Sequence, residues 1–193
     1  MLRLFHTDEK TDKIYELNTD TLKPIRTVAT VNSLLYGIGG GWDGSRLRLF
    51  HCDGLRDEIY ELNPDTLQPI KTVSTISTEP SGIGGGYDGN KLRLFHCDYG
   101  TRKIYELSPD TLQPIKTVNG MNSSPTGIGG GYDGNKLRLY HTDTNTDKIY
   151  ELNPDTLKSI KTVKSFDKIP FGIGGGHQSV KYIEYNGKKV YLT

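Results

Sequence analysis

Short runs in which apolar and polar residues alternate recur along the whole chain. In residues 92–96, which read Leu-Arg-Leu-Phe-His, the leucines and the histidine would share one face of a strand, and the arginine and phenylalanine the other. Ile-Tyr-Glu-Leu at 104–107 and Ile-Lys-Thr-Val at 115–118 also have strand length and composition. No stretch shows the 3.6-residue period of an amphipathic helix. The pattern therefore predicts an all-β protein.

A glycine-rich run, Gly-Ile-Gly-Gly-Gly at 82–86, precedes these strands and is predicted to be the first strand of the same unit. Tyr-Asp-Gly-Asn at 87–90 joins it to the second strand through a turn in which glycine takes a positive φ. A turn with proline at its second position, residues 108–111, joins the third strand to the fourth. The unit is therefore a meander of four short strands.

The unit repeats with a period of 45 residues, because copies of Gly-Ile-Gly-Gly-Gly start at 37, 82, 127 and 172. Four short strands at this period are typical of a β-propeller blade. We predict a small β-propeller of four or five such blades, with a β-solenoid as the less favoured alternative because its coils are usually shorter. The 193 residues then form a single domain, with repeats at about 2–46, 47–91, 92–136 and 137–181 and a C-terminal hairpin at 182–193.

The two ends of the chain depart from the repeat. The sequence begins on a second strand, so the opening blade lacks its first strand, and residues 172–176 could fill that place. Tyr-Ile-Glu-Tyr at 182–185 and Val-Tyr-Leu at 190–192 flank Asn186-Gly187, a strong hairpin signal. Three arrangements remain open: a four-bladed ring with an extra hairpin, a five-bladed ring with incomplete end blades, or two chains that complete each other. We expect residues 172–193 to close the ring against the N-terminal strand or against a second copy.

Several motifs resemble a known repeat. Leu-Arg-Leu-Tyr-His-Thr-Asp at 137–143, Lys-Ile-Tyr at 148–150 and Pro-x-Gly-Ile at 170–173 look like the YWTD repeat with histidine in place of tryptophan. They are also similar to YVTN (YncE-like) repeats. The resemblance covers nearly the whole chain and implies blade architecture, usually in rings of six or seven blades. Blades of these families serve receptors, lyases and scaffolds, so the resemblance implies no single function.

Charge and hydropathy narrow the class of partner. The formal net charge is +1 with both signs interspersed, so there is no basic stripe for nucleic acid. No apolar run approaches the roughly 18 residues that a membrane span needs. Met1 leads directly into a repeat strand, so no signal peptide is expected in this numbering, which leaves a cytoplasmic protein, a mature secreted form or an excised fragment.

The two cysteines, Cys52 and Cys97, stand at equivalent positions one period apart, where Thr7 and Thr142 stand in the other copies. Neighbouring repeats would hold them beyond the roughly 7 Å between Cα atoms that a disulfide allows. We predict that both are small, semi-buried residues interchangeable with threonine, with a redox or metal role as the alternative.

A His-x-Asp pair recurs in the second strand of every copy. Such a pair can bind a metal or support acid–base chemistry. The second strand does not face the axis, however, so the copies should not converge on one site. We predict a structural row that pins blade to blade, as the aspartate does in the YWTD family that the chain resembles, with no metal or cofactor. The row comprises His6, Asp8, His51, Asp53, His96, Asp98, His141 and Asp143.

The first strand, which would line the axis, carries only glycine and isoleucine in its repeated motif. Glycine allows backbones to approach closely. The simplest interpretation is a crowded axis without catalytic groups, and the alternative is that exposed backbone N–H groups bind water or a small anion.

The copies differ mainly in the loop between the second and third strands and in the loop between the fourth and first strands. In a meander these two loops emerge on one face. That face is either free to drift or is used to bind a partner. We predict a non-enzymatic binding or scaffold module that takes a protein or glycan partner through this face, with self-association through the incomplete end blades as a further option. The alternatives are a lectin-like binder that uses Trp42, Tyr87 and Tyr132, one per blade, and an enzyme of the propeller lyase or lactonase kind.

Overall fold

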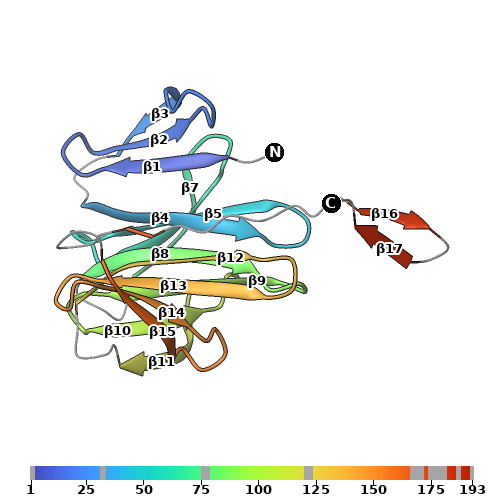
Figure 1. The fold of residues 1–193 in the computed structure, drawn as a ribbon. Coiled ribbons are helices and arrows are strands. Elements are labelled where there is room, and N and C mark those ends of the chain that lie inside the picture. The colour runs from blue at the N-terminus through green and yellow to red at the C-terminus, as the bar shows by residue number, and fades with distance from the viewer. Residues whose placement is uncertain are drawn as a thin grey trace.

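The computed structural model describes residues 3–30, 34–74, 79–119, 124–165, 172–173, 182–185 and 188–191. Within these ranges every regular element is a strand (Figure 1), so no helix is present that could cross a membrane. The strands form antiparallel meanders, which we call blades 1 to 4 in chain order. Blade 1 consists of β1 (Leu4–Asp8), β2 (Lys13–Leu17) and β3 (Pro24–Ala29). Blade 2 consists of β4 (Leu35–Trp42), β5 (Leu47–Asp53), β6 (Glu58–Leu62) and β7 (Pro69–Ser74).

Blades 3 and 4 repeat the four-stranded pattern. Blade 3 consists of β8 (Pro80–Tyr87), β9 (Leu92–Asp98), β10 (Lys103–Leu107) and β11 (Pro114–Asn119). Blade 4 consists of β12 (Pro125–Tyr132), β13 (Leu137–Asp143), β14 (Lys148–Leu152) and β15 (Ser159–Lys164). In each complete blade the glycine-rich strand is an edge strand, which we call the inner strand, and the others follow in chain order. The predicted all-β propeller blade is therefore confirmed, with three complete blades and one three-stranded blade in the described residues.

The turns follow the predicted chemistry. Gly44, Gly89 and Gly134, between the inner and second strands, have φ of 104°, 99° and 95°. The turn between the third and fourth strands places a leucine in the left-handed region, as at Leu67 with φ 60°. This conformation is unfavourable for a bulky residue. Leu67 is only 1% exposed, however, because the turn drives its side chain into the neighbouring blade, and the burial offsets the backbone cost.

The inner strands of neighbouring blades pack backbone against backbone. A Cβ atom added at Gly39 would lie 2.6 Å from the Ile83 carbonyl oxygen, and one added at Gly84 would lie 2.5 Å from that of Ile128. Real Cβ atoms do not approach other heavy atoms this closely, so only glycine fits. The close approach expected from Gly-Ile-Gly-Gly-Gly is therefore present between blades 2, 3 and 4.

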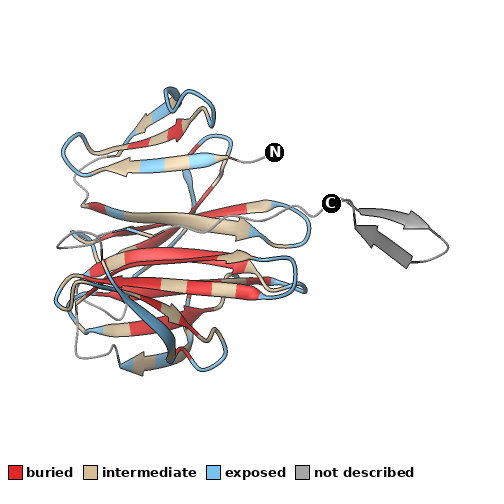
Figure 2. Cartoon of the chain, viewed as in Figure 1, coloured by how far each residue is buried: buried red, intermediate tan, exposed pale blue. Residues whose placement is uncertain are grey.

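Three apolar cores lie between the blades and repeat the same composition. Between blades 2 and 3, Phe50 and Ile59 from one side meet Leu94, Leu107 and Leu112 from the other. Equivalent residues form the cores between blades 3 and 4 and between blades 1 and 2. Figure 2 shows that burial is greatest in the middle blades, whereas the outermost strands β3, β7, β11 and β15 contain no buried residue. The stability of the fold therefore comes from blade-on-blade packing rather than from any single sheet.

The C-terminal segment forms the predicted hairpin. Strands β16 (Tyr182–Tyr185) and β17 (Lys188–Tyr191) pair antiparallel, with Tyr182 opposite Tyr191. Within the described residues, β1 pairs only with β2. The expected closure by residues 172–193 depends on positions that lie mostly outside the described ranges, so it stays a prediction.

Candidate functional site

The histidines of the His-x-Asp row are buried within the blades. His51, His96 and His141 are at most 3% exposed, and each ring stacks on the tyrosine opposite it in the third strand, with centroids 5.3–5.7 Å apart. The Nδ1–H group of His96 donates to the Gly82 carbonyl oxygen at 2.9 Å. That carbonyl belongs to the inner strand of the same blade. The ring therefore fixes the inner strand to the second strand.

Burial also decides the protonation state of these rings. It lowers the pKa of His51, His96 and His141 to about 4, because a charged imidazole loses its hydration inside the blade. All three are neutral near pH 7. A neutral, buried ring that does not titrate near neutrality is poorly suited to general acid–base chemistry.

The aspartates of the row organise the loop that follows them. Asp53 Oδ1 accepts hydrogen bonds from the backbone N–H of Leu55 at 2.9 Å and of Leu34 at 3.2 Å. Asp143 Oδ1 accepts from the N–H and the hydroxyl of Thr146 at 2.8 and 2.9 Å. In the last pair of the row, His141 Nε2 lies 4.0 Å from Asp143 Oδ2. These hydrogen bonds therefore stay inside one blade.

The first member of the row is more open than the others. His6 is exposed and lies 6.0 Å, centroid to centroid, from the Tyr15 ring. Asp8 still holds its loop, since its Oδ1 accepts from the backbone N–H of Lys10 and of Thr11 at 2.9 and 3.0 Å. The row thus keeps its loop-holding geometry even where the imidazole is not covered.

An arginine of the second strand, for which the sequence suggested no role, makes several of the hydrogen bonds that cross from blade to blade. Arg48 donates through Nε and Nη2 to the buried carboxylate of Glu61 at 2.8 and 2.9 Å. Its Nη1 donates to Asp110 in the next blade at 2.7 Å, and its Nη2 donates to the Pro109 carbonyl oxygen at 2.7 Å. We call this set the arginine clasp.

The clasp repeats between the other blades. Arg93 reaches Asp155, and Arg3 reaches Asp65, both at 2.7 Å. The arginine and the aspartate are always 62 residues apart. The fixed separation of 62 residues is the sequence signal that could have revealed the clasp. It is longer than one 45-residue repeat, so an alignment of the copies with one another does not show that the arginine of one copy pairs with the aspartate of the next.

The cysteines are buried thiols in different interblade cores. Cys52 and Cys97 are fully buried and form no disulfide. Burial raises both pKa values, that of Cys97 to about 12, so both are protonated near neutral pH. In the part of the chain that the structure describes, no three His, Cys, Asp or Glu side chains gather where they could hold a metal ion.

The aromatic residues proposed for a lectin-like site lie at the far ends of the inner strands, beside the Asp-Gly turns. Trp42 is 48% exposed. Tyr87 and Tyr132 contact each other edge to face, with ring centroids 6.2 Å apart at 70°. The structure thus brings two of the three together and leaves Trp42 standing in solvent.

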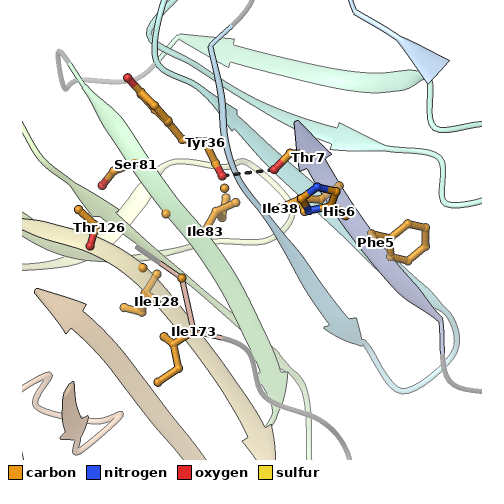
Figure 3. Close-up of a pocket in the computed structure, with 14 residues that line it drawn as sticks. Phe5, His6, Thr7, Tyr36, Ile38, Ser81, Ile83, Thr126, Ile128 and Ile173 are labelled. Carbon is orange, nitrogen blue, oxygen red and sulfur yellow. Dashed lines mark hydrogen bonds between the residues drawn. The ribbon is translucent and has the colours of Figure 1, made fainter. Parts of the chain in front are cut away.

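A cavity of about 260 Å³ lies at the other end of the inner strands (Figure 3). Ile38, Ile83 and Ile128 line it together with Gly172 and Ile173 from the fourth copy of the motif. Its other lining residues include Phe5, His6 and Thr7 of β1 and the position before each Gly-Ile pair, which is Tyr36, Ser81 and Thr126. The repeat therefore changes this lining position in every blade while the adjacent Gly-Ile pair stays constant.

Backbone hydrogen bonds join the two variable loop sets on the face where this cavity lies. The N–H groups of Gly54, Tyr99 and Thr144 donate across, to the carbonyl oxygens of Leu34, Glu79 and Ser124, at 3.0–3.1 Å. We call this the loop face. It exposes Leu55 to 58%, Tyr99 to 45% and Tyr36 to 40%.

The fold and this geometry define the class of protein as a β-propeller. The Myxococcus xanthus glutaminyl cyclase is similar, with a TM-score of 0.64 and 16% identity over 88% of this chain and 75% of that one. A nidogen/laminin complex gives a TM-score of 0.66 and 22% identity over 88% of this chain and 62% of that one. Virginiamycin B lyase from Staphylococcus aureus, in an inactive form with quinupristin, gives a TM-score of 0.60 and 19% identity over 90% of this chain and 56% of that one.

These neighbours are β-propellers and include the YWTD-repeat propeller of nidogen, which agrees with the resemblance seen in the sequence. No protein-family model and no curated protein matches the chain. The chain spans between 56% and 75% of the length of these structures, which comprise two enzymes and one protein complex. At these identities the likeness establishes the fold alone.

Proposed function

We propose that the protein is a non-enzymatic binding module that recognises a segment of another protein through its loop face. The observation that carries this proposal is the group of exposed apolar side chains there, Tyr36, Leu55 and Tyr99, which we call the loop-face patch. Apolar side chains that gather on one part of a surface often mark a site where another molecule docks. Tyrosine is also among the residues that most often dominate the binding energy of interfaces.

The patch lies next to the cavity, so an occupant could use both. The Tyr36 ring packs over Gly54, the residue before Leu55, where a Cβ atom would clash with it. Tyr36 and its equivalents Ser81 and Thr126 line the cavity beside the three isoleucines. The lining combines isoleucine side chains with hydroxyl groups, so the cavity can accept a single side chain of a bound peptide. This arrangement favours a protein ligand with one anchoring apolar residue.

Two alternatives remain in view. The fold neighbours include a lyase and a cyclase, so a catalytic role is compatible with the fold. Against a catalytic role, His51, His96 and His141 are buried and neutral near pH 7. A lectin-like role would use Trp42, Tyr87 and Tyr132, which belong to the opposite ends of the inner strands.

The experiment selects ligands from a random-peptide phage library on the parent protein and measures the enriched peptides by fluorescence anisotropy. We expect the peptides to share an apolar anchor residue. A chain with Tyr36→Ala, Leu55→Ala and Tyr99→Ala should bind them at least about tenfold more weakly, which corresponds to about 1.4 kcal/mol. All three side chains are partly exposed, so the variant should keep its fold.

The matched control is Trp42→Ala, which removes a similarly exposed aromatic residue from the opposite end of an inner strand. It should bind the selected peptides as the parent does. A glycan-array signal that Trp42→Ala abolishes would favour the lectin-like alternative. Failure to enrich any peptide, or equal binding by the triple variant and the parent, would contradict the proposal.

A further inference from the structure

Each interblade core is built from two complementary faces. The following blade supplies a ridge of leucines, and the turn leucines Leu67, Leu112 and Leu157 in this ridge are 1%, 3% and 2% exposed. The preceding blade supplies a socket of an aromatic residue, an isoleucine and a valine, such as Phe50, Ile59 and Val73. The same ridge and socket meet at all three described interfaces. Each blade therefore has one ridge face and one socket face.

Blade 1 presents a ridge that no other blade in the described part of the chain covers. Leu22, the equivalent of the three buried turn leucines, is 63% exposed. Leu4 is 37% exposed, whereas its equivalents Leu49 and Leu94 are 2% and 0% exposed. The apolar ridge that stabilises every other interface thus lies in solvent at one end of the molecule.

Blade 4 presents a socket that no ridge among the described residues enters. Val163 is 46% exposed, whereas its equivalents Val73 and Val118 pack against interblade cores. Ile149 and Tyr140 are only half-buried, although the equivalent isoleucines and phenylalanines of blades 2 and 3 are almost completely buried. The second end of the molecule is therefore the apolar complement of the first.

The charged groups at the two ends are complementary as well. Arg138 binds Glu151 at 2.6–2.7 Å, and among the described residues it reaches no turn aspartate. Its side chain is 36% exposed, compared with 7% for Arg48 and 10% for Arg93, which both close a clasp. Asp20 occupies the place in blade 1 that Asp65, Asp110 and Asp155 occupy in the other blades, and no arginine of the described residues reaches it. One end thus holds a clasp donor and the other a clasp acceptor.

We propose that blade 4 of one copy docks on blade 1 of a second copy, head to tail, with the same contacts that join blades within the chain. Leu22 enters the socket beside Ile149 and Val163, and Arg138 binds Asp20. A second copy fits because the three interblade cores join blade 1 to blade 2, blade 2 to blade 3 and blade 3 to blade 4, and none of them joins blade 4 to blade 1. The chain also spans only 56–75% of the propeller chains it resembles. Contacts of this kind are heterologous, so they form a ring where the rotation closes. The end faces are distinct from the loop face, so this inference does not depend on the proposed function.

The first test measures mass in solution by size-exclusion chromatography with light scattering over a dilution series. The parent should reach at least twice the 21.5 kDa of one chain at high concentration. Leu22→Asp should stay at 21.5 kDa and remain folded, because Leu22 is exposed in an isolated chain and aspartate tolerates its φ of 56°. A parent that is monomeric throughout, or an assembly that Leu22→Asp leaves intact, would overturn the proposal.

The second test separates a second copy from closure by the chain's own blade 1. Arg138→Glu and Asp20→Arg should each be monomeric alone and should assemble when mixed, because the mixture pairs each reversed charge with its complement. Lys136→Glu, an equal charge change at an exposed turn residue, should assemble like the parent. If the two changes restore the parent's properties only when combined in one chain, and the mixture stays monomeric, then the chain closes on itself and the proposal fails.

Discussion

At the scale of the residue, the glycines of the inner strand and the histidines of the second strand contribute to packing in opposite ways. The inner-strand glycines remove side chains so that neighbouring backbones can touch, as between Gly84 and Ile128. The histidines instead fill space within the blade: His96, for example, stacks on Tyr105 and donates a hydrogen bond to the Gly82 carbonyl oxygen. The repeated Gly-Ile-Gly-Gly-Gly motif thus meets a packing requirement.

Gly84→Val tests this requirement. The new side chain would place Cβ 2.5 Å from the Ile128 carbonyl oxygen, so blades 3 and 4 would have to separate. We expect a loss of about 1–3 kcal/mol or more in the free energy of unfolding, measured from the urea midpoint. Asn90→Ala, in an exposed turn of the same blade, is the control and should lie within about 0.5 kcal/mol of the parent. Equal midpoints for the two variants would show that the inner strands are not tightly packed.

At the scale of the element, the alternation of apolar and polar residues predicted the strands, their order and the C-terminal hairpin. The turn glycines were predicted as well, because a positive φ has a local cause. The arginine clasp was not predicted, since it depends on how far one blade is offset from the next. The cavity was missed for a related reason: Tyr36, Ser81 and Thr126 share no chemistry that marks them as one site until the inner strands are brought together.

The clasp itself can be tested at Arg48. Arg48→Met leaves the Glu61 carboxylate buried without its bidentate partner, although Lys71 and Arg46 approach it at 3.8–4.0 Å. Breaking one side of a buried pair costs on the order of 3–5 kcal/mol, and the long-range cations should reduce that loss. We therefore expect thermal unfolding to show a clear drop in melting temperature, partly recovered by adding Glu61→Leu.

Lys91→Met serves as the control, because it removes an exposed cation from a turn. It should leave the melting temperature near that of the parent. If Arg48→Met behaves like the control, then the clasp adds nothing to blade-on-blade packing.

At the scale of the whole molecule, the three buried histidines make stability depend on pH in one direction. Their pKa values are about 4 in the folded chain and about 6.5 when unfolded, so between these values the unfolded chain binds more protons. Stability from these groups is therefore complete above about pH 6.5 and is lost as the pH falls toward 4. Each histidine contributes at most roughly 3 kcal/mol of this change.

Urea unfolding at several pH values between about 4 and 7 measures the slope of the unfolding free energy. His96→Gln should lower that slope by up to the contribution of one proton, because the variant has one titrating group fewer. The matched control is His6→Gln, which removes an imidazole at the exposed member of the row and leaves the buried set untouched. Equal slopes in the parent and in His96→Gln would contradict the neutral, buried assignment of the ring.

The constant separation of 62 residues between each clasp arginine and its aspartate has a consequence for how such a chain can change over generations. Because every junction uses the same donor, acceptor and leucine, a recombination event that inserts or deletes one 45-residue unit creates a junction with all its parts already present. No compensating substitution is needed on either side of the new boundary. The number of blades can therefore vary in single steps, while the sequences of the variable loops change independently.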